Sequence, residues 1–263
     1  MLRVSFVVDD LDGRLGAALA GAVAGERRAG VPTGAGQLLD AAESTAERGG
    51  FDAEDLARRG LDGLPPSGIA SLPLRAVVYG LHTPANRPLL RRSAHRSARL
   101  AGADEGTAMT AVAAAVLAAD LLRFDLDWCL ARLHQTLLEE APQALLDRLR
   151  PLPDSAPLRG DADPGAALQI AITALQRAGS VAEVFAELDA YGEDLAVALS
   201  LAGALAGARG GPGDDRAWMD GLSPRVEAVA GALAASARDR LPAPALAQPP
   251  RATTLESPRH ERS

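Results

Sequence analysis

Apolar residues recur every three or four positions along most of the first 240 residues of the chain. This spacing places them on one face of a helix, so the chain is predicted to fold as a series of amphipathic helices joined by turns. The predicted helices cover residues 12–25, 36–48, 53–60, 73–79, 88–100, 105–122, two segments within 126–150, and residues 166–178 and 181–190.

Helix-capping and turn residues mark several of the predicted boundaries. Asp12 and Asp52 are predicted to cap the first and third helices, because a short carboxylate accepts from free amides at a helix start. The segment Pro-Pro-Ser-Gly at 65–68 is predicted to be a loop. Residues 1–240 are predicted to form one helical domain, and the Pro-rich segment 241–263, which has no apolar period, a disordered tail.

The composition strengthens the prediction of an all-α fold. Hydrophobic residues make up 48% of the chain and aromatic residues only 3%, so Ala and Leu dominate the core. Two segments, 12–25 and 195–211, are built almost wholly from small residues. Helices of this kind approach closely, and we expect Gly21, Gly25, Gly203 and Gly207 to lie at close helix crossings. The repeated Ala, Arg, Gly and Pro are typical of a high-GC bacterial coding bias.

The charge and the lack of targeting signals limit the classes of partner and compartment. A formal net charge of −7 and a pI near 5.2 argue against general nucleic-acid binding, which needs a basic face. The single cysteine, Cys129, excludes a disulfide framework and is expected to be a buried, inert thiol. The sequence shows neither a signal peptide nor an apolar run of membrane-spanning length. We therefore expect a cytoplasmic protein that does not associate with membranes.

One basic cluster stands out in the segment 87–99. Arg87, Arg91 and His95 share one helical face, and Arg92, Arg96 and Arg99 share the neighbouring face. Such a run is typical of a solvated face paired with local acids, although it could also receive an anion or an acidic partner. The histidines lie far apart, and none pairs with a neighbouring Ser or Cys in a nucleophile motif.

Two adjacent carboxylates, Glu193 and Asp194, precede the second small-residue segment. Either the pair caps the helix that follows, or it is the remnant of a site that held a cation. The surrounding residues favour a relationship to a known family. The segments "LGAALAGAVAGE" (15–26), "AESTAERGGFDAEDLARR" (42–59), "RSARLAGAD" (96–104) and "GALAGARGG" (203–211), followed by Trp218, resemble the ADP-ribosylglycohydrolase family in order and spacing.

This resemblance implies an all-α, compact orthogonal helical domain with a two-magnesium centre. The family's metal ligands come from an early Thr-Asp-Asp-Thr motif and a late Asp-Thr-Asp-Thr motif, which supply the oxygens that magnesium requires. Residues 32–35, Pro-Thr-Gly-Ala, stand in place of the early motif, and Asp194 is the one carboxylate left of the late motif, with Ala196 and Val197 after it. We therefore expect magnesium binding to be lost and Asp194 to act mainly as a helix cap.

Two functions remain open at this point. In the first, the protein is a relative of these hydrolases without their magnesium-dependent activity, and it binds another protein or an ADP-ribose-like ligand in a regulatory role. In the second, it hydrolyses ADP-ribose or a related N-glycoside with a rebuilt site. The remnant candidates for that site are Glu26, Asp104, Glu193 and Asp194, and the second function requires several of them to converge.

Overall fold

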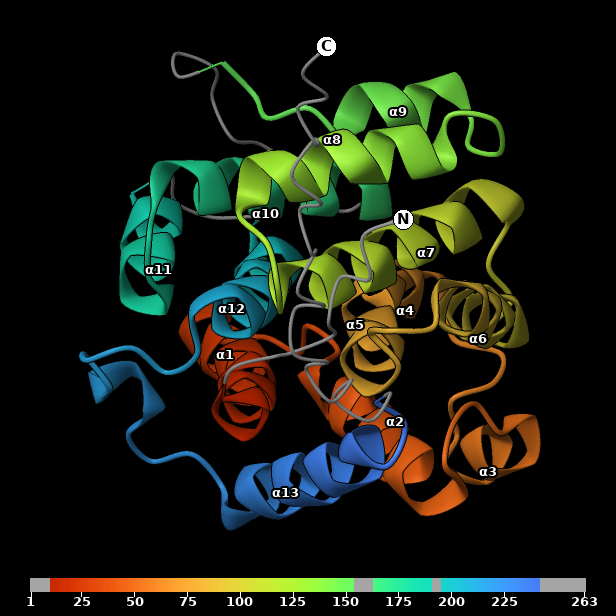
Figure 1. Ribbon diagram of the computed structural model, residues 1–263, viewed down its shortest axis with the longest axis horizontal. Coiled ribbons are helices and arrows are strands. Elements are labelled where there is room, and N and C mark those ends of the chain that lie inside the picture. The colour runs from red at the N-terminus through yellow and green to blue at the C-terminus, as the bar shows by residue number, and fades with distance from the viewer. Residues whose placement is uncertain (1–9, 154–162, 191–194, 242–263) are drawn as a thin grey trace, which may run out of the picture.

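The computed structural model of the chain describes residues 10–153, 163–190 and 195–241. Within these residues every regular element is a helix, which confirms the predicted all-α class (Figure 1). The elements are α1 (Leu11–Ala29), α2 (Ala35–Arg48), α3 (Ala53–Arg58), α4 (Pro66–Ile69), α5 (Leu72–His82), α6 (Arg87–Leu100), α7 (Glu105–Leu121), α8 (Leu126–Leu137), α9 (Gln143–Arg148), α10 (Pro164–Arg177), α11 (Val181–Asp189), α12 (Ala196–Gly210), the 3₁₀ helix η1 (Ala217–Met219) and α13 (Pro224–Arg238).

Helices α5 and α7 form the centre of the core. Every residue of α7 from Ala108 to Leu121 is buried, and so is every residue of α5. Between Gly106 and Ala119, α7 carries no charged side chain, and a helix that is apolar on all sides is stable only when it is surrounded by other helices. In Figure 1, α8, α9 and α10 lie on one side of this centre, and α2 and α13 lie on the other.

The two small-residue helices, α1 and α12, cross in backbone contact. A Cβ atom added at Gly203 would lie 2.4 Å from the carbonyl oxygen of Gly21, and one added at Gly21 would lie 2.2 Å from that of Gly203. At Gly25 and Gly207 an added Cβ would meet α12 and α1 at 2.6 and 2.3 Å. The prediction that these four glycines lie at close helix crossings is confirmed.

A second close crossing joins α5 to α7. At Gly80 an added Cβ would lie 2.0 Å from the carbonyl oxygen of Ala115. No repeated small-residue pattern surrounds Gly80 in the sequence, so this contact was not predicted. Both crossings bring helix backbones into direct contact.

Two predicted boundaries are wrong. The cap of α1 is Asp10, whose carboxylate accepts from the amide of Gly13, while Asp12 lies within the first turn. The predicted loop at 65–68 contains the start of α4, because Pro66 occupies the first helical position, where its missing N–H costs no hydrogen bond. Asp52 caps α3 as predicted, accepting from the amide of Asp55 at 2.9 Å.

The ends of the chain are described only in part. Apart from Leu241, the tail predicted to be disordered lies outside the described residues. Within the part of the chain that the structure covers, no helix combines the length and the apolar character needed to cross a bilayer.

Candidate functional site

The segment between α1 and α2 meets the second turn of α12. The hydroxyl oxygens of Thr33 and Ser200 lie 2.5 Å apart, although 167 residues separate them in the sequence. Both side chains are buried, with 2% and 0% of their surface exposed. The structure therefore brings Thr33, within the stretch that stands in place of the early motif, next to Ser200, which follows Ala196 and Val197 in α12.

Glu26 occupies the centre of this meeting point. Its Oε2 atom accepts hydrogen bonds from the backbone amides of Thr33, Gly34 and Ala35 at 2.7, 3.1 and 3.0 Å. The hydroxyl of Thr33 donates to the same oxygen at 3.0 Å. These amides belong to the start of α2, where unpaired N–H groups and the helix dipole favour a negative charge. The carboxylate of Glu26 therefore caps α2 from the end of α1.

Gly34, whose amide donates to Glu26, has a backbone conformation that favours glycine. It is the N-cap residue of α2 and has a φ of 98°, in the left-handed region that residues with a Cβ rarely adopt. A Cβ added at this position would lie 2.4 Å from the Cβ of Ser71. An aspartate at position 34, which the resemblance would require of a metal ligand, is therefore disfavoured by the positive φ and would clash with Ser71 unless the backbone moved.

The described side chains at this cluster offer fewer oxygen ligands than a two-magnesium centre requires. Magnesium takes six oxygen ligands in a near-octahedral array, and the cluster offers one carboxylate that is already engaged and two hydroxyls that bond to each other. Ala196 and Val197 supply no side-chain oxygen. Across the described ranges of the chain, no group of three or more His, Cys, Asp or Glu side chains is placed to hold a metal ion.

Two of the four remnant candidates, Glu193 and Asp194, come just before α12 in the sequence. Glu193 and Asp194 lie outside the described residues, and the N-cap position of α12 belongs to Leu195, which makes no side-chain capping bond. A role for Asp194 near the start of α12, as a cap or as a ligand, stays a prediction.

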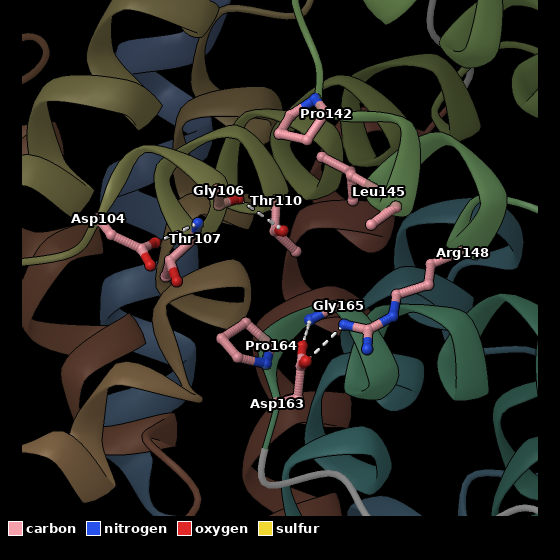
Figure 2. Close-up of a pocket in the computed structure, with 11 residues that line it drawn as sticks. Asp104, Gly106, Thr107, Thr110, Pro142, Leu145, Arg148, Asp163, Pro164 and Gly165 are labelled. Atoms are coloured by element: carbon pink, nitrogen blue, oxygen red, sulfur yellow. Dashed lines mark hydrogen bonds and ion pairs between the residues drawn. The ribbon is translucent and has the colours of Figure 1, made fainter.

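The remaining candidate, Asp104, lies at the start of α7. Its carboxylate accepts from the amide of Thr107 at 2.8 Å and so caps that helix (Figure 2). This hydrogen bond to the Thr107 amide lowers the pKa of Asp104 below its usual value. The side chain is therefore ionised at neutral pH and is not a proton donor. Glu26 and Asp104 hold the starts of two different helices, α2 and α7.

Asp104 also lines a cavity of about 230 Å³ between α7, α9 and α10. Opposite it, Asp163 accepts from the amide of Gly165 at 2.7 Å and from the guanidinium of Arg148 at 2.5 Å (Figure 2). The hydroxyl of Thr110 donates back to the carbonyl of Gly106. The polar groups of this cavity thus bond to one another. Asp104 caps α7 and Asp163 caps α10.

His82 and Ser236 form a contact that the sequence did not reveal. His82 Nε2 and Ser236 Oγ lie 2.9 Å apart, with 154 residues between them in the chain. Burial lowers the pKa of His82 to about 4, with a smaller contribution from the charge of Arg240. Such a weakly basic imidazole is a poor general base at neutral pH. Cys129 is buried as predicted, and burial raises its pKa to about 12.

The arrangement of the helices can be compared with known proteins. No protein-family model and no curated protein matches the sequence. Among the solved structures that match is one described as an "ADP-ribosylglycohydrolase-related protein complex", with a TM-score of 0.68. The similarity covers 86% of this chain and 98% of that chain, at 22% sequence identity. The chain has the ADP-ribosylglycohydrolase fold.

The ADP-ribosylglycohydrolase fold explains why residues 33 and 200 meet. The resemblance placed metal motifs at the start of α2 and near the start of α12, and the structure brings these two regions into contact at Thr33 and Ser200. The chain therefore keeps the framework around this position, while its own residues at the centre are hydroxyls, a capping carboxylate and a glycine.

Proposed function

We propose that this protein is an ADP-ribosylglycohydrolase-like pseudoenzyme. It has the fold but not the magnesium-dependent hydrolase activity, and it acts by binding a protein partner or an ADP-ribose-like ligand. Hydrolysis of an ADP-ribosyl bond in the family that the sequence resembles depends on metal ions that orient the ribose and activate water. Each ion needs several fixed oxygen ligands, which the described residues do not supply.

The hydrogen bonding of Glu26 is the observation that supports this proposal best. One oxygen of its carboxylate accepts four hydrogen bonds from residues 33–35, so the carboxylate stabilises the start of α2. Recruiting Glu26 to a metal ion would release three backbone amides at a helix start. Each buried polar group left without a partner costs about 1–3 kcal/mol. A rebuilt metal site at this position therefore has to overcome the loss of a helix cap.

The geometry of Gly34 supports the same conclusion from a second direction. Position 34 has a positive φ and faces the Cβ of Ser71, so a ligand side chain there would meet both backbone strain and a close contact. A single reversion to aspartate would not restore a ligand in the required position.

A hydrolysis assay tests this proposal. The full chain would be incubated with ADP-ribosylated arginine and serine peptides, with magnesium or with a chelator, and free ADP-ribose would be quantified against a buffer blank. We expect release at the level of the blank in every arm. Turnover that disappears both with chelator and in Asp194→Ala would contradict the proposal and would favour the rebuilt site.

A further inference from the structure

A cavity of about 220 Å³ opens at the far end of α2 from Glu26. It lies where the C-terminal ends of α2, α5 and α13 approach α6. It is lined by twelve residues, among them Arg48, Phe51, Arg92, Arg96 and Arg240. Four of these residues are arginines, and none is an aspartate or a glutamate.

The positive charge of this cavity is only partly compensated. Arg48 forms an ion pair with Asp55 at 3.1 Å, but Asp55 also pairs with two other arginines. The guanidinium of Arg96 lies over the ring of Phe51, 4.9 Å from its centre. Among the described residues, Arg92 and Arg240 have no carboxylate partner. The lining therefore holds about three uncompensated positive charges.

The arginines of α6 divide into a face that pairs with acids and a face that does not. On one face of the helix, Arg87, Arg91 and His95 pair with Asp120, Glu140 and Glu105, as predicted for a solvated basic face. The neighbouring face differs, because Arg92 and Arg96 line the cavity and form no ion pair within the described residues, although both also border a second hollow that contains Glu140. The two faces of one helix thus have different electrostatic surroundings.

The helix ends around the cavity do not account for this charge. The C-terminal ends of α2, α5 and α13 lie at the cavity, and each carries a partial charge of roughly −0.5. Three such ends balance about one and a half arginines. Arg240 lies close to the end of α2, with its Nη2 atom 2.6 Å from where a Cβ of Gly49 would be. An excess of more than about one positive charge remains after this compensation.

We propose that this cavity binds a small phosphate-bearing anion, either free phosphate or a simple phosphate monoester. Guanidinium groups bind phosphate oxygens through paired, charge-assisted hydrogen bonds, and several converging arginines are typical of phosphate sites. The cavity is smaller than the roughly 300–1,000 Å³ of sites for drug-sized ligands, which suits an anion with few additional atoms. Arg92 and Arg240 are exposed, so an ion from solvent reaches them directly.

This site is separate from the cluster at Glu26. The two lie at opposite ends of α2, and a helix of 14 residues spans about 20 Å. Phosphate binding therefore requires neither a metal ion nor the cluster at Glu26, so a negative result for one proposal leaves the other standing.

Calorimetric titration of the full chain with inorganic phosphate tests this inference, with glycerol phosphate in a second arm and sulfate in a third. Phosphate and the monoester distinguish a free ion from an esterified group as the ligand. The variants are Arg92→Gln and Arg240→Gln, and the matched control is Arg216→Gln. Arg216 is also an exposed arginine, but its only side-chain hydrogen bond within the described residues is to the carbonyl of Gly213. Thermal melts would verify that each variant is folded.

We expect one saturable site for phosphate or the monoester. Each of Arg92→Gln and Arg240→Gln should weaken binding about tenfold or more, because each removes a charge-assisted hydrogen bond. The control variant should bind like the unmodified chain. Three results would overturn the inference: no saturable binding of either ligand, equal affinity in all variants, or sulfate binding as tightly as phosphate. Equal binding of sulfate would indicate an unspecific anion surface.

Discussion

Replacing Gly203 by alanine tests how the two small-residue helices hold the fold together. The new Cβ would lie 2.4 Å from the carbonyl oxygen of Gly21 and 2.9 Å from Cζ of Phe185. Non-bonded atoms at an optimal separation are about 3.5 Å apart or more, so α1 and α12 have to separate locally by about 1 Å. Overpacking of a well-packed core by this kind of change costs about 1–3 kcal/mol of the free energy of unfolding.

Gly231→Ala provides a matched control. Gly231 is an exposed residue within α13, and nothing lies within 4 Å of a Cβ added there. Both variants gain the helix propensity of alanine over glycine, which is about 1 kcal/mol. Only Gly203→Ala also overpacks the core. The difference between the two variants therefore isolates the cost of separating α1 from α12.

Thermal unfolding followed by circular dichroism measures this difference. For a chain of this size, 1 kcal/mol shifts the midpoint by about 2–4 °C, so the two variants should differ by about 2–12 °C. Gly203→Leu should be less stable still, because it adds three further carbons at the same contact. If Gly203→Ala melts at or above the midpoint of Gly231→Ala, the close crossing does not exist as described.

Three further variants test the caps and the buried histidine. Glu26→Ala should lower the free energy of unfolding in urea by about 1–3 kcal/mol, because it frees the amides of residues 33–35; an unchanged value would show that the carboxylate does not cap α2. Asp104→Ala should cost about 0.5–2 kcal/mol in the same measurement, whereas Asp104→Asn should cost much less, since asparagine is also a good cap. The pKa of His82 is about 4 in the folded chain and about 6.5 when unfolded, so the unfolded state binds a proton first as the pH falls. Stability should therefore decrease by up to about 3 kcal/mol between pH 6.5 and 4, and His82→Gln should remove most of this slope; an unchanged slope would refute the assignment.

The helical fold was largely predictable because apolar spacing and small residues are local signals. The crossing of α1 and α12 was predictable for the same reason. Gly21 and Gly25 are four residues apart and so share one helical face, and the same holds for Gly203 and Gly207. Boundaries were harder to predict. Aspartates at positions 10 and 12 are both possible caps of α1 in the sequence, and the structure shows that Asp10 accepts from the amide of Gly13.

The site was predictable only in part, because it depends on contacts between distant segments. The resemblance indicated that residues 32–35 and the start of α12 belong to one region, and the contact of Thr33 with Ser200 agrees with this. The role of Glu26 depends on the direction of its side chain toward three amides, which no sequence pattern specifies. The arginine-lined cavity likewise joins Arg48, Arg92 and Arg240 from three separate helix ends or faces.

The central claim, that the chain has the fold without the metal chemistry, is tested most directly by isothermal titration calorimetry with magnesium. The full chain would be titrated with magnesium alone, with ADP-ribose alone, and with magnesium in the presence of ADP-ribose. We predict no saturable heat for magnesium in either setting, because Glu26 is engaged as a helix cap and Gly34, Ala196 and Val197 offer no ligand oxygen from their side chains. Saturable magnesium binding at micromolar concentration that is lost in Asp194→Ala would contradict this account.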